Sequence, residues 1–340
     1  MTAPADLRTP TINLITGCWG TQVIHAAVRL GIPDRIARAP LTAEEIASAA
    51  GTHAGATFRL MRALAVLGLV KHLDGERFEL TDSGQLLRTD VPDSLAIMTR
   101  HWGGRAWRSF AHLEEAVRTG DPIKDSGREG FQSLEHRPED AAVFNETMAA
   151  QTAAVAPAIL DAYDFSAFRS VTDVGGGYGA LIAALLQKHA HLKGASADLA
   201  YMEANALRYL NKAGVADRAR FVPTEFFTSI EAGADCYLLK FIIHDWNDTD
   251  SIAILRNTCT AAGDKGLVLI VEQIAPERAS PHPQHVAAIR TDVQMLAGVG
   301  GMERTVPEYR ALLTASGLQL RRVVPTASPF SIIEATPLRG

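Results

Sequence analysis

Residues 172–186 read TDVGGGYGALIAALL, an apolar strand that runs into a glycine-rich turn and directly on into an apolar helix. The turn contains four glycines: Gly175, Gly176, Gly177 and Gly179. Glycines permit positive φ and remove Cβ atoms, so a ligand can approach the backbone closely. About twenty residues later, Asp198 ends a second predicted strand, and its carboxylate can accept hydrogen bonds from both hydroxyls of a ribose. The turn and the acid together indicate a ligand that contains adenosine.

The spacing of the glycines distinguishes between adenosine-containing cofactors. A dinucleotide-binding turn usually shows GxGxxG, whereas this one reads GGGxG. Asp173 lies just before the turn, where it would repel a phosphate but could accept a hydrogen bond from an ammonium group. The combination favours S-adenosylmethionine, which carries an amine and a sulfonium, over a nicotinamide dinucleotide. The glycines alone would also fit simple chain reversal, but with Asp173 and Asp198 in place cofactor binding is favoured.

Strand and helix patterns alternate from Ser170 to the C-terminus. This alternation predicts an α/β fold with a mostly parallel sheet covered by helices on both faces. The domain is expected to begin near residues 155–169. The predicted strands lie in the segments SVTDVGGG (170–177), LKGASADL (192–199), RARFVPTEFF (218–227), ADCYLLKFIIHDW (234–246), GLVLIVEQI (266–274), LQLRRVV (318–324) and FSIIEAT (330–336).

The N-terminal part reads as helices followed by a hairpin. Residues 11–39 have apolar positions at helical spacing, enough for the segment to pack against a second subunit. In residues 41–88, Thr42 and Glu45 predict a capping box, a second helix ends at Gly68, and two short strands flank Asp74-Gly75. Helix, helix and a two-stranded wing form a winged-helix pattern.

A winged helix raises the possibility of DNA binding, which the charges do not support. Residues 1–90 contain nine Lys/Arg and nine Asp/Glu, and the whole chain of 340 residues has a net charge of −5. A protein that reads a DNA groove normally gathers positive charge to release phosphate counterions. Dimerisation or scaffolding is therefore favoured, and neither nucleic acid nor an anionic membrane is expected as a partner.

Cysteine usage and hydropathy indicate a cytoplasmic protein. Three cysteines occur without a CxxC or a Cys/His cluster, so neither a disulfide framework nor a structural metal site is predicted. No apolar run approaches the ~18 residues that a membrane span requires. The N-terminus, MTAPADLRTP, shows no secretory signal.

Ionisable residues follow two apolar strands. In LLKFIIHDWND (238–248) the apolar run is followed by His244 and Asp245, and Glu272 ends GLVLIVE (266–272). Ligands of open α/β sheets bind beyond the carboxyl ends of the strands, so these groups are expected beside the glycine turn. With Glu303, which follows another glycine turn, the acids could hold the His244 tautomer and stabilise its imidazolium. The alternative is a structural His–Asp pair that caps the next helix.

These motifs resemble the family of S-adenosylmethionine-dependent O-methyltransferases typified by plant caffeate and flavonoid enzymes and by bacterial tailoring enzymes of aromatic natural products. The resemblance runs nearly end to end. It implies a helical, winged-helix dimerisation domain (1–100), a helical connector that contributes to the substrate pocket (101–165) and a Rossmann-like class I methyltransferase domain (166–340). Its most specific marks are DVGGGYG (173–179), LKGASADLA (192–200), FIIHDWND (241–248), VEQIAP (271–276) and GGMERT (300–305).

The resemblance also implies roles for individual residues. His244 matches the catalytic base, Glu272 and Glu303 match the acids beside it, and Asp245 matches a supporting or substrate-facing acid. Glu225 and Phe226 stand where the family often has Asp-Phe or Asp-Met against adenosine, so the acceptor is one methylene longer here. The other implied cofactor residues are Asp173, Gly175, Gly177, Asp198 and Lys240. The implied substrate residues are Trp102, Phe144, Met148 and Met295.

The resulting hypothesis is methyl transfer from S-adenosylmethionine to a phenolic hydroxyl of a small aromatic substrate, by a homodimer that needs no metal. Two alternatives stay open. Relatives of this family use the same scaffold for other tailoring chemistry, including hydroxylation. The winged helix could also belong to a cofactor-sensing regulator, which the balanced charge of residues 1–90 disfavours.

Overall fold

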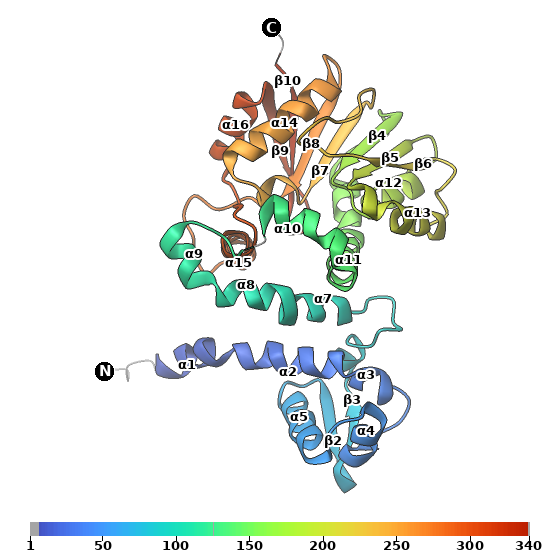
Figure 1. Ribbon diagram of the computed structural model, residues 1–340, viewed down its shortest axis with the longest axis vertical. Helices are drawn as coiled ribbons and strands as arrows, with labels where there is room; N and C mark the ends of the chain where they lie inside the picture. Colours follow the sequence, from blue (N-terminus) through green and yellow to red (C-terminus); the bar gives the residue numbers. More distant parts are fainter. Residues whose placement is uncertain (1–6, 125, 339–340) are drawn as a thin grey trace. The chain divides into compact units, whose positions relative to one another are not determined.

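The computed structural model describes residues 7–124 and 126–338, and the chain divides into two compact units, Met1–Arg108 and Ser109–Gly340 (Figure 1). This boundary falls inside segment 101–165, the predicted connector, and not near residues 155–169. The larger part of that segment folds with the second unit because Ile159 and Leu160 are buried in its core. Residues 101–108 belong to the first unit.

The first unit contains helices and a small antiparallel sheet. The predicted capping box is confirmed: Thr42 Oγ1 accepts from Glu45 N, and Glu45 Oε2 accepts from Thr42 N. The hairpin is also confirmed, with Gly75 at φ 70° in its turn. The sheet has a third strand, in the order β1-β3-β2. Its elements are α1 (Arg8–Thr16), α2 (Cys18–Arg29), α3 (Ile32–Arg35), β1 (Leu41–Thr42), α4 (Ala43–Ala50), α5 (Ala54–Val66), β2 (Val70–Leu73), β3 (Arg77–Leu80), α6 (Asp82–Gln85) and α7 (Ala96–His101).

Apolar side chains of the first helices are left uncovered within this chain. Leu14 is 83% exposed and Ile15 72% exposed, and helix α1 buries none of its residues. Trp19 on α2 is 42% exposed. Contiguous exposed apolar groups of this kind mark an interaction surface. None of the helices among the described residues has the length and hydropathy needed to cross a membrane.

The second unit is a seven-stranded sheet, within its described residues, with helices on both faces. The strand order is β6-β5-β4-β7-β8-β10-β9; the first five strands are parallel, and β10 is antiparallel to both β8 and β9. The predicted α/β fold is therefore confirmed. Its elements are the end of α8 (Trp107–Ala111), which the boundary after Arg108 divides, α9 (Leu113–Thr119), α10 (Gly127–Ser133), α11 (Pro138–Ala162), β4 (Ser170–Val174), α12 (Ala180–Lys188), β5 (Lys193–Asp198), α13 (Glu203–Lys212), β6 (Ala219–Pro223), β7 (Cys236–Lys240), α14 (Asp248–Ala262), β8 (Leu267–Glu272), α15 (Pro283–Gly298), α16 (Val306–Ala315), β9 (Leu318–Pro325) and β10 (Ser331–Pro337).

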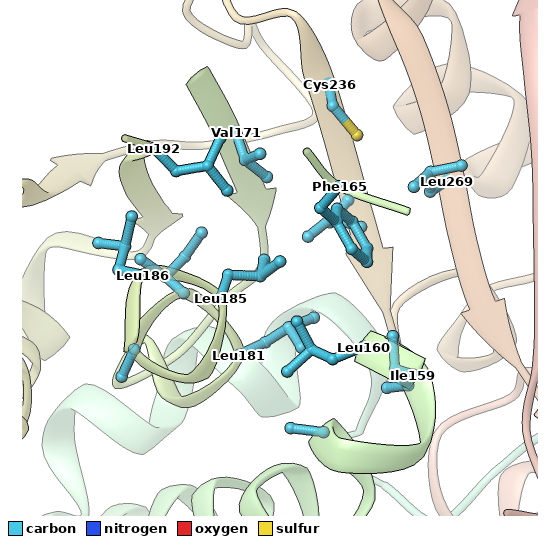
Figure 2. Packing of buried hydrophobic residues seen from close by; sticks show 14 of the residues in the cluster. Ile159, Leu160, Phe165, Val171, Leu181, Leu185, Leu186, Leu192, Cys236 and Leu269 are labelled. Carbon is cyan, nitrogen blue, oxygen red and sulfur yellow. The ribbon is translucent and has the colours of Figure 1, made fainter. Parts of the chain in front are cut away.

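Each central strand contributes to two cores because its side chains alternate between the faces of the sheet. On one face Leu238 and Leu269 pack in one cluster with Leu181 and Leu185 of α12. Figure 2 shows Leu181, Leu185 and Leu269 in this cluster. On the other face Leu239 of β7 and Ile270 of β8, whose side chains point the opposite way, pack with residues of α14 and α16. With both faces covered, the open edge at the carboxyl ends of the parallel strands is left for a ligand.

The sheet also determines where that ligand edge lies. Strand order reverses between β4 and β7, which are paired in parallel, and such a switch point opens a crevice at the carboxyl ends of the strands. The glycine turn follows β4, Asp198 ends β5, Lys240 ends β7 and Glu272 ends β8. Five of the predicted site positions are therefore placed at one edge by topology alone: Gly175, Gly177, Asp198, Lys240 and Glu272.

Candidate active site

The segment after β7 leaves strand geometry earlier than the apolar run predicts. The strand ends at Lys240 because Phe241 has a φ of 58°, a conformation that non-glycine residues rarely adopt. A 3-10 turn, Ile243–Asp245, follows. The Phe241 and His244 rings stack with centroids 5.7 Å apart. The strained backbone at Phe241 thus turns the chain so that His244 lies in a compact loop at the edge of the sheet.

His244 is surrounded by the three acids that the sequence analysis grouped with it. Its Nδ1 is hydrogen-bonded to Glu303 Oε1 at 2.8 Å and lies 3.5 Å from Glu272 Oε2. Its Nε2 lies 3.6 Å from Asp245 Oδ1. The Glu272 and Glu303 side chains are fully buried, whereas the His244 side chain is 10% exposed. With Nδ1 held by Glu303, Nε2 is the ring nitrogen left to face a ligand.

Glu272 and Glu303 have different contacts. Glu272 Oε1 accepts hydrogen bonds from the backbone N–H of Ile242 (3.0 Å), Ile243 (3.1 Å) and His244 (3.4 Å). It therefore holds the backbone of the loop, while Glu303 holds the imidazole. Glu303 is itself fixed by the hydrogen bond from its backbone N to Asp292 Oδ1 at 2.9 Å.

The acids change the protonation of the imidazole. Burial disfavours the imidazolium, but the charges of Glu272, Glu303 and Asp245 outweigh it and raise the pKa of His244 to about 10. Ligand atoms of His244, Glu272 and Glu303 lie within 4.8 Å of one another, a spacing that a metal ion could also use. Hydrogen bonds hold one oxygen of each carboxylate, Glu272 Oε1 and Glu303 Oε1, whereas the second oxygen of each, Oε2, is buried without a hydrogen-bond partner among the described residues.

Three residues that the sequence analysis did not single out complete this cluster: Gly301, Asp292 and Arg304. A Cβ at Gly301 would lie 2.0 Å from His244 O, so only glycine allows the two loops to meet. Met302 N donates to that same His244 oxygen at 2.9 Å. Arg304 is 1% exposed. The sequence offered one signal for this role: Arg304 directly follows Glu303 in GGMERT. Arginine is rarely fully buried unless its charge is paired, so a buried arginine at that position would need partners nearby.

The glycine turn has the features expected of a cofactor cradle. Gly177 has a φ of 56°, and a Cβ built there would meet nothing within 4 Å, so the space above it is open. Gly177 N donates to Asp198 Oδ2 at 2.8 Å, and Leu199 N donates to Asp198 Oδ1 at 2.7 Å. Burial raises the pKa of Asp198 to about 6, against the effect of these hydrogen bonds. Near neutral pH the carboxylate is mostly ionised, and its remaining lone pairs can accept hydroxyl hydrogens.

Asp173, near the end of β4, and Lys240, at the end of the neighbouring strand β7, are buried groups of opposite charge. Asp173 is 2% exposed and Lys240 is 8% exposed. Burial raises the pKa of Asp173 and lowers that of Lys240, and each effect is opposed by the charge of the other residue. The Lys240 Nζ atom lies 3.4 Å from the centroid of the Phe241 ring. Because Asp173 is almost fully buried, we expect the pair to act mainly through its charge at the ends of β4 and β7.

Glu225 and Phe226 follow β6 at the same edge. A Cβ on Gly175 would lie 3.8 Å from Phe226 Cε1, which places this ring beside the glycine turn. Glu225 lines a cavity of about 630 Å³ together with Leu199, Tyr201 and Gln132. Glu225 Oε2 accepts from Gln132 Nε2 at 3.5 Å. The longer acid is therefore held by Gln132 of α10, which lines the same cavity.

The four predicted substrate residues lie in different surroundings. The Phe144 ring is 5.8 Å from that of Phe131, which in turn lies 5.7 Å from Trp246 in the loop that carries His244. Met295 is buried on α15, and Met148 lies on α11 one turn after Phe144. Trp102 begins a π-helical turn, Trp102–Ala106, in the first unit. Its predicted place in the substrate pocket stays a prediction.

Comparisons with known proteins agree with the geometry. Residues 110–319 match a family model described as an O-methyltransferase domain, and residues 12–90 match an O-methyltransferase dimerisation domain. The phenazine O-methyltransferase PhzM of Lysobacter antibioticus is 39% identical over 329 residues, which cover 96% of this chain and 95% of that protein. The solved structure of LaPhzM superimposes with a TM-score of 0.92 at 38% identity and covers 98% of this chain and 99% of that one.

Two further relatives bear on the chemistry. An O-methyltransferase from neocarzinostatin biosynthesis, solved with S-adenosylmethionine and 2-hydroxy-5-methyl naphthoic acid, has a TM-score of 0.82 at 34% identity and covers 94% of this chain and 96% of that one. Aclacinomycin 10-hydroxylase RdmB of Streptomyces purpurascens is 32% identical over 340 residues and covers 95% of this chain and 88% of that protein. The same architecture therefore occurs in proteins named for different reactions.

Proposed function

Because this chain belongs to the S-adenosylmethionine-dependent O-methyltransferase family, we propose that it methylates a phenolic hydroxyl of a small aromatic natural-product intermediate, with His244 as general base. One observation carries the choice of base. The imidazole of His244 is held through Nδ1 by Glu303 at 2.8 Å, at the same sheet edge as the glycine turn of β4. An oriented imidazole beside a cofactor cradle is the arrangement that general-base catalysis needs.

The residues around the glycine turn fit the methyl donor. Open space above Gly177, the spare lone pairs of Asp198 and the cavity beside Glu225 suit an adenosine with two free hydroxyls. Phe226 would flank the donor near Gly175. S-adenosylmethionine supplies an electrophilic methyl group on a sulfonium when it is bound. We assign Gly175, Gly177, Asp198, Glu225 and Phe226 to holding it, with Asp173 and Lys240 near the ends of β4 and β7.

The task left to the protein is to align the nucleophile and to accept its proton. A phenol with a pKa of about 10 is roughly one-thousandth ionised at neutral pH, a handicap of at most ~4 kcal/mol, whereas alignment of two reactants can contribute ~7–11 kcal/mol. Nε2 of His244 takes the phenolic proton, and Glu303 stabilises the charge that results. Because the pKa of His244 is about 10, the phenol and the imidazole have nearly equal affinities for the proton that passes between them.

The raised pKa of His244 predicts the pH dependence of the reaction. The base is the neutral imidazole, and below its pKa that form becomes about tenfold more abundant with each pH unit. With a pKa of about 10, kcat/KM should therefore keep rising from pH 7 to beyond pH 9. Initial rates across this range with one phenol test it. A plateau that already begins near pH 7 would contradict the raised pKa.

Asp198 is expected to control the affinity for the donor. Replacing Asp198 by alanine removes the acceptor for the ribose hydroxyls and the partner of Gly177 N–H. Hydrogen bonds to charged groups contribute about 1.5–3 kcal/mol, so the Kd for S-adenosylmethionine should rise roughly 10- to 100-fold, as measured by isothermal titration calorimetry.

Asp235 offers a matched control for that change. It also accepts two backbone N–H groups, from Arg169 (2.7 Å) and Ser170 (3.1 Å), but at the opposite end of the strands. Asp235→Ala should leave the Kd unchanged. Equal affinities in the Asp198 and Asp235 variants would remove Asp198 from the cofactor site.

The first unit supports a homodimer. Residues 12–90 match a dimerisation domain, and Leu14, Ile15 and Trp19 expose apolar surface on the first two helices. We propose that a second copy of the chain covers this surface. Light scattering on the purified protein tests the stoichiometry directly.

The proposed reaction is tested with a donor labelled in its methyl carbon. The substrate panel follows the ring systems of the relatives, hydroxyphenazines and hydroxynaphthoic acids. Mass spectrometry should show one labelled methyl group on the oxygen of one phenol, formed at least 100-fold more slowly by a His244→Gln variant. The relative named as a hydroxylase makes oxygen insertion the competing outcome. A product that gains oxygen, or no label on any phenol, would contradict O-methylation.

A further inference from the structure

Arg304 is the largest fully buried side chain of a charged residue among those described, at 1% exposure. Its guanidinium donates to two backbone carbonyls of the His244 loop: Nη1 to Ile243 O at 3.0 Å and Nη2 to Trp246 O at 2.8 Å. Nη2 and Nε also donate to Asp248 Oδ1 at 2.8 and 3.0 Å, and Nη2 to Ser251 Oγ at 3.3 Å. All five contacts lie within residues 243–251.

The loop that carries His244 is therefore held from two sides. Glu272 accepts from the N–H groups on one side, from Ile242 to His244. On the other side, Arg304 donates to the carbonyls of Ile243 and Trp246, and Met302 N donates to the carbonyl between them, that of His244. These are backbone contacts, so they fix the position of the His244 Cα independently of the side chain.

The contact of Arg304 with the loop backbone is also linked to the imidazole of His244 through the sequence. Arg304 directly follows Glu303, the hydrogen-bond partner of Nδ1. Its backbone is tied to the strand end, because Ala275 N donates to Arg304 O at 3.0 Å. Two consecutive residues thus hold His244: Glu303 binds its ring, and Arg304 binds the backbone of its loop. The planar guanidinium of arginine has five N–H donors and can bind the two separate carbonyls of Ile243 and Trp246 at once. The ammonium group of lysine is a compact charge and does not offer this geometry.

We propose that Arg304 is a positioning residue for the methyl transfer: it clamps the carbonyls of Ile243 and Trp246 and so keeps Nε2 of His244 aligned with the acceptor hydroxyl. It touches neither the substrate nor the donor in this role. The inference rests on the proposed function of His244 as the base. Asp248, which is 68% exposed, neutralises the guanidinium from the solvent side.

The experiment compares Arg304→Ala and Arg304→Lys with a matched control, Arg218→Ala. Arg218 also donates to backbone carbonyls, those of Leu186 (3.0 Å), His189 (3.2 Å) and Leu192 (3.3 Å), but at the other end of the sheet. Three quantities are measured: kcat and KM for both substrates, the imidazole resonances of His244 by NMR, and kcat after addition of millimolar guanidinium. The His244 resonances are assigned by their absence in a His244→Gln variant.

Arg304→Ala should lower kcat by about 100-fold, the loss that a displacement of roughly 1 Å can cause, and leave KM for S-adenosylmethionine unchanged. Free guanidinium should restore part of kcat in this variant and none in Arg218→Ala, whose kcat should equal that of the wild type. The His244 resonances should shift in both Arg304 variants, and Arg304→Lys should recover only part of kcat.

A folded Arg304→Ala protein with wild-type kcat, or with lowered kcat but unshifted His244 resonances, would overturn the proposal. If the alanine variant does not fold, the lysine variant decides by the same two readouts. A wild-type protein that methylates no phenol would instead refute the proposed function, and the NMR comparison would still show whether Arg304 positions His244.

Discussion

Replacing His244 by alanine is expected to slow methyl transfer by two orders of magnitude or more and to leave the Kd for S-adenosylmethionine unchanged. The variant removes the imidazole whose Nε2 is left to take the phenolic proton once Nδ1 is held by Glu303. The variant also loses the imidazole that orients the acceptor hydroxyl, and since alignment of two reactants can contribute ~7–11 kcal/mol, losing only part of it slows the reaction by two orders of magnitude. Single-turnover rates and calorimetric titration with the donor measure the two quantities separately.

His244→Ala should also destabilise the fold, and His244→Gln separates this loss of stability from the loss of the base. Without the imidazole, the fully buried carboxylates of Glu272 and Glu303 lose the positive charge beside them, and an uncompensated buried charge costs about 3–5 kcal/mol. His244→Gln keeps an N–H donor of similar reach toward Glu303 but has no basic nitrogen. It should therefore be more stable than His244→Ala and equally slow. A wild-type rate in either folded variant would exclude His244 as the base.

Replacing Gly301 by alanine should also reduce kcat by about 100-fold, although residue 301 carries no reactive group. A Cβ at this position would lie 2.0 Å from His244 O, 2.4 Å from Asp245 C and 2.7 Å from Trp246 N. These are backbone atoms and cannot rotate away, so the two loops must separate. Separation breaks the Met302 N–His244 O hydrogen bond of 2.9 Å and moves Glu303 away from Nδ1.

Steady-state kinetics and thermal unfolding of Gly301→Ala test this prediction together. Overpacking should lower the free energy of unfolding by about 1–3 kcal/mol. Gly214→Ala is the control, because Gly214 has a φ of +73° with nothing within 4 Å of an added Cβ. It should lose about 1 kcal/mol through backbone strain and keep its kcat. Equal kcat values for the two variants would show that the contact at Gly301 does not position His244.

The sequence alone predicted the α/β fold, the glycine turn, the hairpin around Asp74-Gly75 and the helix that Thr42 and Glu45 cap. Each of these depends on residues close together in the chain, namely alternation within a strand, a run of glycines or a capping pair. It placed the domain boundary near residues 155–169 because the strand patterns begin there. The structure divides at Arg108, since packing of α11 on the sheet joins the helical segment to the second unit.

The identities of His244, Glu272 and Glu303 were also visible in the sequence, from strand ends and from the family resemblance. The tertiary structure decided what each acid does: Glu272 accepts from the loop backbone and Glu303 from the imidazole, across 59 residues of sequence. It likewise decided that Arg304 is buried against the same loop and that Gly301 must lack a Cβ. Local patterns could not encode these contacts, because they arise where the loop after β7 meets the segment before α16, and only the packing of the whole sheet brings the two together.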